Sequence, residues 1–164
     1  MRYDTLTTTI GTLTLAASDQ GLRHILFEHA DAPAPAVHPL AVAGGWRRDL
    51  GALAEASAQL RAYFAGELRQ FTLRLDPLGT PFQRSVWQAL SEIGFGNTRS
   101  YSDIAQAIGN ARAVRAVGAA NGRNPLPIVV PCHRVIGRDG SLTGYAGGLP
   151  IKRWLLAHEE THVT

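Results

Sequence analysis

The sequence predicts an α+β fold, in which a β-sheet and a helix form an N-terminal lobe and several helices form a C-terminal lobe. Strand-like runs dominate the segment that ends at Phe27, whereas helix caps and helical periodicity dominate after Thr80. A chain of 164 residues with 45% apolar content suffices for one domain, or for two small lobes that share a core. We place the two lobes at residues 1–77 and 78–164.

The first part of the chain predicts a meander of three strands. β-Branched and apolar residues are frequent in Tyr3–Thr9, Thr12–Ala17 and Leu22–Phe27. Turns that contain glycine, at Ile10-Gly11 and Asp19–Gly21, separate the three runs. An antiparallel sheet is therefore expected at the N-terminus.

The segment between these strands and Thr80 is mixed. Ala30–Gly45 holds three prolines and predicts a loop. Leu50–Leu68 predicts a helix, because large apolar residues recur on one helical face from Leu50 onward. Phe71–Leu75 predicts a short strand, and Asp76–Thr80 predicts a linker between the lobes.

Helices dominate the second half. Thr80 has the features of an N-cap, and a helix is predicted over Pro81–Ile93. Two shorter helices follow, in Ser100–Gly109 and Ala111–Asn121, and Gly122 is a natural C-cap for the second of them. Two short helices joined by a tight glycine turn are typical of a helix-turn-helix, although plain helical hairpins share the pattern.

The second of these short helices has a small and basic surface. Alanine and glycine occupy most of its positions, so its backbone can approach a partner closely, although tight packing between helices would use the same residues. Arg112 and Arg115 are three residues apart and are expected on roughly one face. The remaining segments predict a strand in Ile128–Val130, a glycine-rich loop in Ser141–Gly148 and an amphipathic helix in Pro150–Glu160.

The positive charge is concentrated in the second half. The net charge is only +3, but six arginines and a single acidic residue lie between positions 99 and 138. This distribution favours a polyanionic partner, although a solvated basic face would give the same pattern. The chain has no apolar run long enough for a membrane span, and its polar start lacks a signal peptide, so we expect a cytoplasmic protein with no membrane partner.

Cys132 is the only cysteine. A single cysteine excludes an intramolecular disulfide and a multi-cysteine zinc site, and we expect neither a metal nor an organic cofactor. It is either an inert core residue or a reactive thiol. A nucleophilic cysteine must form a thiolate, which neighbouring cations or histidines favour, and His133 and Arg134 follow it directly. If the segment were a strand, Cys132 and His133 would point to opposite faces, so a turn or a water would have to connect them.

Several spaced segments together resemble the O6-alkylguanine-DNA alkyltransferases (methylated-DNA–protein-cysteine methyltransferases), in their short single-cysteine bacterial form. The similarity covers about residues 78–160, whereas residues 1–77 match only in length and in rough element order. The segments that carry it are Pro131–Gly137 around the cysteine, Asn124–Val130 before it, Gly144–Gly148, Trp154–Glu159 and the helix-turn-helix from Tyr101 to Arg115. The resemblance implies a ribonuclease H-like N-terminal lobe and a DNA-binding, alkyl-accepting C-terminal domain with a winged helix-turn-helix.

The resemblance also implies catalytic roles. Cys132 matches the alkyl acceptor, His133 the base that activates it through a water, and Glu159 the carboxylate that orients the histidine. If the register were off by one residue, Glu160 would take the place of Glu159. Asn124 matches the residue that braces the site.

Further positions match residues that contact DNA or the substrate. Tyr101 matches the tyrosine that contacts the flipped base and donates a proton, and Arg115 matches the arginine that fills the gap in the duplex. The expected DNA-binding residues are Arg115, Arg112, Ala113, Ala116, Gly118 and Arg123. The expected pocket residues are Tyr101, Val135, Tyr145 and Ala146. Some members of the family have serine at the position of Ala146, but the expected contact there comes from the backbone N–H.

The predicted function is therefore direct-reversal repair. The alkyl group on O6 of guanine in double-stranded DNA would move to Cys132 after base flipping, once per protein molecule, by a protein that we expect to be monomeric without DNA. The alternatives are a DNA-binding sensor without chemistry, a helix-turn-helix regulator with a structural cysteine, and a cysteine hydrolase using Cys132 and His133. Non-catalytic relatives carry tryptophan in place of the cysteine, so this chain is expected to react.

Overall fold

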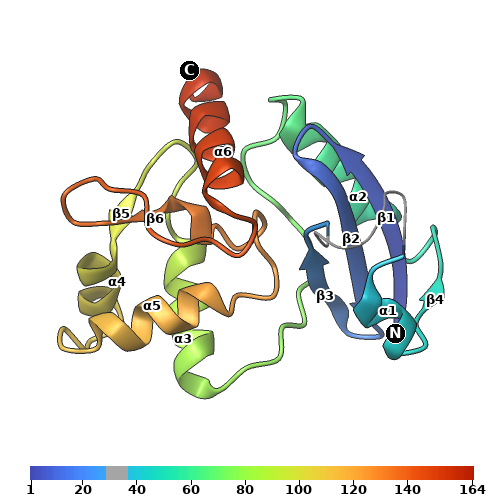
Figure 1. Ribbon diagram of the computed structural model, residues 1–164, viewed down its shortest axis with the longest axis horizontal. Coiled ribbons are helices and arrows are strands. Elements are labelled where there is room, and N and C mark those ends of the chain that lie inside the picture. Colours follow the sequence, from blue (N-terminus) through green and yellow to red (C-terminus); the bar gives the residue numbers. More distant parts are fainter. Residues whose placement is uncertain (29–36) are drawn as a thin grey trace. The chain divides into compact units, whose positions relative to one another are not determined.

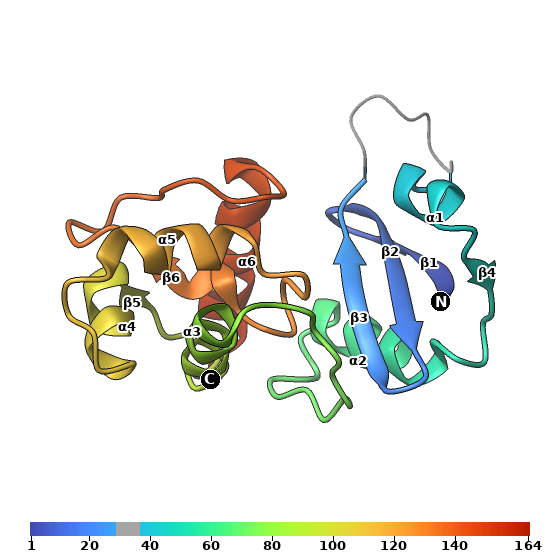
Figure 2. The same ribbon diagram turned by 90° about the horizontal axis from the view of Figure 1, so that it is seen from below.

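The computed structural model describes residues 1–28 and 37–164, which form two compact units, Met1–Leu78 and Gly79–Thr164 (Figures 1 and 2). The structure has the α+β composition that the sequence predicts, with the sheet in the first unit and most of the helices in the second. No described helix is both long enough and apolar enough to span a membrane.

The first unit is built on a sheet with strand order β3-β2-β1-β4. Strands β1 (Arg2–Thr8), β2 (Gly11–Ser18) and β3 (Gly21–Leu26) form the predicted antiparallel meander, and the two-residue β4 (Arg47–Arg48) adds to β1 in parallel. Strand β4 was not predicted, since two residues carry no periodicity. Its main contribution to the unit is to close the free edge of β1.

Two helices accompany this sheet. Helix α1 (Pro39–Ala43) lies in the segment that was predicted as a loop; the prediction is wrong there because Pro39 opens a helix whose first N–H is capped by His38 Nδ1. Residues 29–36 of that predicted loop lie outside the described part of the chain. Ala41 of α1 packs in one cluster with Tyr3, Ala16 and Trp46.

Helix α2 (Ala54–Phe64) is shorter than the helix predicted over Leu50–Leu68. Leu50 precedes it and is exposed, so it does not belong to the buried apolar face, whereas Leu60 is fully buried. The predicted strand Phe71–Leu75 is also wrong, because only Leu75 forms a bridge, with Leu22. Two backbone hydrogen bonds make this bridge, from the N–H of Leu22 to the carbonyl of Arg74 at 2.9 Å and from the N–H of Asp76 to the carbonyl of Leu22 at 2.8 Å.

The second unit contains four helices and a two-stranded parallel pair. Capping boxes begin two of the helices: Thr80 with Gln83 for α3 (Pro81–Ser91), and Ser100 with Asp103 for α4 (Tyr101–Ala107). Helix α5 (Val114–Gly122) packs against both α3 and α4 (Figure 2). The unit therefore contains the predicted helix-turn-helix, made of α4 and α5.

The remaining elements of the second unit frame the cysteine. β5 (Arg99–Ser100) pairs in parallel with β6 (Val135–Ile136), directly after the 3₁₀ turn η1 (Cys132–Arg134). Helix α6 (Leu149–His162) contacts η1 and closes the chain. The turn η1, which contains the cysteine, thus contacts α3 and α6 and leads directly into β6.

Candidate active site around Cys132

The turn before Cys132 is held by Asn124. Its side chain donates from Nδ2 to the carbonyl of Val130 at 2.8 Å and accepts from the N–H of Leu126 at 3.0 Å. The strand predicted over Ile128–Val130 is wrong: Ile128 adopts a left-handed conformation with φ of 77°. This conformation is rare for a β-branched residue and persists only where its surroundings enforce it. The Asn124 bonds and the neighbouring prolines provide that enforcement.

Cys132 begins the turn η1 and is almost completely buried, with 5% of its surface exposed. Burial raises the pKa of the Cys132 thiol to about 11, although hydrogen bonds from Asn124 and Tyr145 and the positive charge of Lys152 act in the opposite direction. The free protein therefore carries a protonated thiol at neutral pH. A base is needed to turn this thiol into a nucleophile.

His133 provides a base in the right protonation state. It is fully buried, and its Nε2 lies 2.6 Å from Glu159 Oε2. Burial lowers the pKa of His133, although its hydrogen bond to Glu159 acts to raise it. At neutral pH the imidazole is therefore neutral. The segment is a 3₁₀ turn and not a strand, so the strand geometry considered from the sequence does not apply. In this turn His133 contacts Glu159 of α6, while Cys132 contacts Asn124 and Tyr145.

Glu159 is the centre of a buried charge cluster. Burial opposes ionisation of its carboxyl, but hydrogen bonds from His133 and Arg134 hold the pKa of Glu159 well below its ordinary value. Arg134 forms a bidentate ion pair with this carboxylate: its Nε donates to Oε1 at 2.7 Å and its Nη2 donates to Oε2 at 3.0 Å. The N–H of Gly96 also donates to Oε1 at 3.2 Å. Glu160, the alternative considered from the sequence, is exposed.

The sequence analysis assigned no role to Lys152, which is fully buried on α6. Its Nζ donates to the carbonyl of Val135 at 2.7 Å and to that of Thr143 at 3.2 Å. Among the described residues it forms no ion pair with a carboxylate. Its charge acts instead on Cys132, and burial lowers the pKa of Lys152 while the thiol acts to raise it. Lys152 thus joins both ends of the loop after Val135 and favours the thiolate.

Tyr101 contacts the loop after Val135, and the predicted pocket residues Tyr145 and Ala146 belong to that loop. The Tyr101 hydroxyl lies 2.5 Å from Thr143 Oγ1, and a Cβ added at Gly118 would lie 3.9 Å from the Tyr101 ring. Tyr145 is half-buried and in contact with the thiol, whereas Ala146 is exposed. Val135, also predicted as a pocket residue, is fully buried.

Helix α5 presents the predicted DNA-binding residues. Arg115 and Ala116 are exposed on it, Gly118 is half-buried, and Arg123 is its exposed C-cap. Arg112 and Ala113 precede the helix, because a turn at Asn110 delays its start to Val114. The expectation that Arg112 and Arg115 share a helical face is therefore wrong, although both are exposed.

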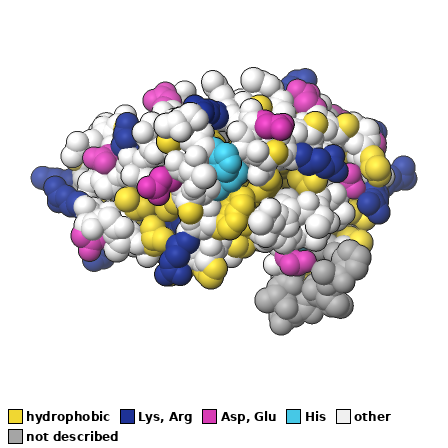
Figure 3. Space-filling view, turned by 90° about the horizontal axis from the view of Figure 1, so that it is seen from above, with side chains coloured by type: hydrophobic (Ala, Val, Ile, Leu, Met, Phe, Trp, Pro, Cys, Tyr) yellow, Lys and Arg dark blue, Asp and Glu magenta, His cyan; other side chains and the backbone are white. Residues whose placement is uncertain are grey.

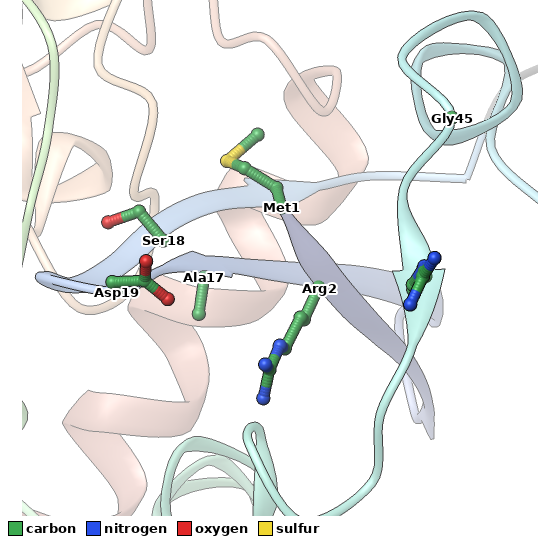
Figure 4. A pocket seen from close by; sticks show the side chains of 7 residues that line it. Met1, Arg2, Ala17, Ser18, Asp19 and Gly45 are labelled. Atoms are coloured by element: carbon green, nitrogen blue, oxygen red, sulfur yellow. The ribbon is translucent and has the colours of Figure 1, made fainter.

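Outside the site around Cys132, we compared the charged surface, a cavity in the first unit and the possible metal ligands of the described residues. On the face drawn in Figure 3, basic side chains lie interspersed with acidic ones. A cavity of about 310 Å³ in the first unit is lined by residues that include Arg2, Ser18 and Asp19 (Figure 4). Arg2 already pairs with Asp49 at 3.0 Å, and the Ser18 hydroxyl donates to the carboxylate of Asp76. Within residues 1–28 and 37–164, no three His, Cys, Asp or Glu side chains form a group that could hold a metal ion.

Comparisons with known proteins match the two parts of the chain to two different domains of one family. Residues 1–77 match the family model described as 6-O-methylguanine DNA methyltransferase, ribonuclease-like domain. Residues 81–161 match the model described as 6-O-methylguanine DNA methyltransferase, DNA binding domain. The two matches together span nearly the entire chain.

Relatives and solved structures give the same result. A methylated-DNA–protein-cysteine methyltransferase of Methanosarcina barkeri is 48% identical, over 99% of both chains. One from Mycolicibacterium paratuberculosis is 49% identical, over 99% of this chain and 94% of the relative. The crystal structure of Mycobacterium tuberculosis OGT in complex with DNA superimposes with a TM-score of 0.87 at 46% identity, covering 99% of this chain and 94% of that one. This chain therefore belongs to the 6-O-methylguanine DNA methyltransferase family.

Proposed function

We propose that this protein repairs O6-alkylguanine in double-stranded DNA by moving the alkyl group irreversibly to Cys132, once per molecule. The observation that carries the proposal is geometric: the buried Cys132 is followed directly by the buried His133, whose Nε2 lies 2.6 Å from Glu159 Oε2. This is the arrangement of a nucleophile, a base and an orienting acid. Membership of the family, shown by the comparisons, supports the same reaction.

The chemistry is a displacement at carbon. His133 takes the thiol proton through one water, the sulfur attacks the alkyl carbon, and the bond between that carbon and guanine O6 breaks. The electron pair of that bond remains on the guanine, which takes a proton from the Tyr101 hydroxyl. The product is a thioether, which has no leaving group for a hydrolytic step, so the protein acts once. Apart from the one water molecule and the DNA, the groups in this scheme are side chains of the chain itself.

The DNA-facing part of the proposal rests on α5. An alkylated guanine must leave the base stack to reach a buried thiol, at a cost of a few kcal/mol. The small residues Ala116 and Gly118 allow a close approach of the backbone, and Arg115 fills the gap left in the duplex. Arg112 and Arg123, at the two ends of the helix, bind phosphates, and Ala113 lies at its start. We place the protein in the cytoplasm, as a monomer without DNA.

The test is a mass measurement. The protein is mixed with duplex DNA that contains one O6-methylguanine, and its intact mass and a digest are recorded. A gain of one methyl group on the peptide that contains Cys132, with no further gain in excess DNA, is expected. Cys132→Ala should abolish the gain but still bind DNA. An unchanged mass in folded protein with a reduced thiol would favour a sensor without chemistry.

A further inference from the structure

Two polar atoms next to Cys132 are buried and have no hydrogen-bond partner among the described residues: His133 Nδ1 and Asn121 Oδ1. Asn121 lies in the last turn of α5, and its Nδ2 lies 3.5 Å from the carbonyl oxygen of Cys132. That carbonyl belongs to the peptide bond that joins Cys132 to His133. Both atoms therefore belong to the immediate surroundings of the nucleophile, where buried polar groups normally have partners.

Both of these atoms are hydrogen-bond acceptors. The orientation of the Asn121 amide follows from its neighbour, because exchanging its oxygen and nitrogen would turn two oxygens toward each other. Oδ1 is therefore the atom without a partner. On the histidine, the ionised Glu159 accepts from Nε2–H, so the proton of the neutral ring is on Nε2 and Nδ1 keeps its lone pair.

Two acceptors cannot bond to each other, but they can share a donor that has two hydrogens. A water molecule is the smallest such donor, and buried waters typically make about three hydrogen bonds. A water bound to both acceptors keeps an oxygen lone pair for a third bond. The Cys132 S–H is the donor available for it, since the thiol belongs to the same turn.

We propose that Asn121 is a positioning residue that holds, together with His133, the water through which the Cys132 proton leaves. The inference rests on the proposed function and adds a residue to it. The thiol proton moves to the water, and the water's own proton moves to His133 Nδ1. The other hydrogen of the water stays bonded to the water oxygen and is donated to Asn121 Oδ1, which fixes the direction of the relay. The sulfur electron pair is thereby freed to form the bond to the alkyl carbon.

Asn121→Leu tests this role, because leucine has nearly the same shape and no acceptor. The single-turnover rate of methyl transfer from duplex DNA should fall by roughly tenfold at neutral pH. The remaining rate should rise steadily with pH, because thiolate must then form without the relay. The groups near the thiol that carry or exchange charge are unchanged by the substitution: His133, Arg134, Tyr145, Lys152 and Glu159. Asn97→Leu, at an exposed position of the same unit, is the matched control.

A purely structural role would change other quantities. A structural role would lower the melting temperature of Asn121→Leu. The transfer rate of the molecules that remain folded would then depend on pH as it does in the parent protein. Asn121→Ala removes the same oxygen without adding bulk and must show the same altered profile. In a His133→Phe background, Asn121→Leu should change the rate by less than about twofold, because the two residues act on one water. Independent, multiplicative losses would overturn the inference.

The outcomes separate this inference from the proposed function. Parent-like rates and pH profiles in both Asn121 variants, with transfer still abolished by Cys132→Ala, would remove Asn121 from the mechanism and leave the repair function intact. Absence of transfer in the parent protein would instead contradict the function itself. A high-resolution crystal structure of the unmodified protein supplies a direct check. It should show an ordered water within hydrogen-bond distance of His133 Nδ1 and Asn121 Oδ1, and a well-defined site without one would contradict the inference.

Discussion

Glu159 Oε2 accepts from His133 Nε2 at 2.6 Å while the same carboxylate binds the guanidinium of Arg134. One carboxylate therefore fixes the tautomer of the base and compensates a buried cation. Removing it would affect both the chemistry and the fold, whereas a purely orienting carboxylate would affect only the chemistry.

Glu159→Gln is expected to lower stability and transfer rate together. The substitution leaves Arg134 buried without its counter-charge, which costs about 3–5 kcal/mol in comparable cases. It also replaces the charged acceptor of His133 Nε2–H by a neutral amide, whose single oxygen must serve both His133 and Arg134. Urea denaturation and single-turnover transfer measure the two effects, with Glu160→Gln, exposed on the same helix, as the control. A variant with the parent's unfolding midpoint would show that the charge cluster does not stabilise the fold.

Lys152→Met should raise the pKa of the Cys132 thiol further. Methionine has a similar length but no charge, so the thiolate loses the nearby cation that favours it. The transfer rate at neutral pH, where Lys152 carries its charge, should therefore fall. Arg153→Met, at the next and exposed position, controls for loss of a positive charge on α6. An unchanged transfer rate would limit Lys152 to holding the loop at Thr143.

Stability should fall at alkaline pH because of Cys132. Its pKa is about 11 in the folded protein against an ordinary value of 9.0. Between these values the unfolded chain loses the thiol proton first, so unfolding becomes more favourable as the pH rises. The difference corresponds to on the order of 3 kcal/mol. Cys132→Ser lacks this ionisation, so its melting temperature should decrease less than that of the parent between neutral pH and about pH 10. Equal decreases would argue against the raised pKa.

The transfer rate should decrease in acid only at pH values below the ordinary pKa of histidine. Burial lowers the pKa of His133 from 6.5, so the imidazole remains an available base in mildly acidic solution. The single-turnover rate should therefore stay high as the pH falls through 6.5 and decline only below it. A midpoint at or above 6.5 would mean that His133 is solvated or is not the base. Free O6-methylguanine as substrate separates this effect from DNA binding.

Arg115→Ala should affect the reaction with duplex DNA but not the reaction with the free base. The side chain is exposed on α5 and contacts nothing that holds the thiol in place in the described structure. If it fills the gap in the duplex, repair of duplex DNA should fall while reaction with free O6-methylguanine stays unchanged. Equal losses on both substrates would remove this role.

Local signals in the sequence predicted the helix starts well and the site geometry only in part. The capping residues Thr80 and Ser100 mark α3 and α4 because an N-cap is a short-range hydrogen-bond pattern. The left-handed Ile128 was missed, since β-branched residues in a row favour a strand and only the Asn124 bonds overrule them. The strand prediction there failed for that reason.

Long-range contacts account for the residues that the sequence left without a role. Lys152 has the appearance of a surface lysine on an amphipathic helix, and its burial becomes visible only when α6 is packed on the loop. Arg134 seemed a cation for the neighbouring thiol, whereas it binds Glu159, 25 positions away. Asn121 had no distinguishing motif at all. Partners so distant in sequence are set by packing, which periodicity and spacing do not encode.

The burial of Cys132 has a consequence for how long each molecule remains usable. A protein that reacts only once is lost if its sulfur meets a stray oxidant or electrophile first. Reactivity toward such agents follows thiolate content and exposure, and this thiol is protonated at neutral pH and 5% exposed. The same enclosure that makes the sulfur a poor nucleophile in the resting protein thus slows its reaction with oxidants and preserves it for a damaged base.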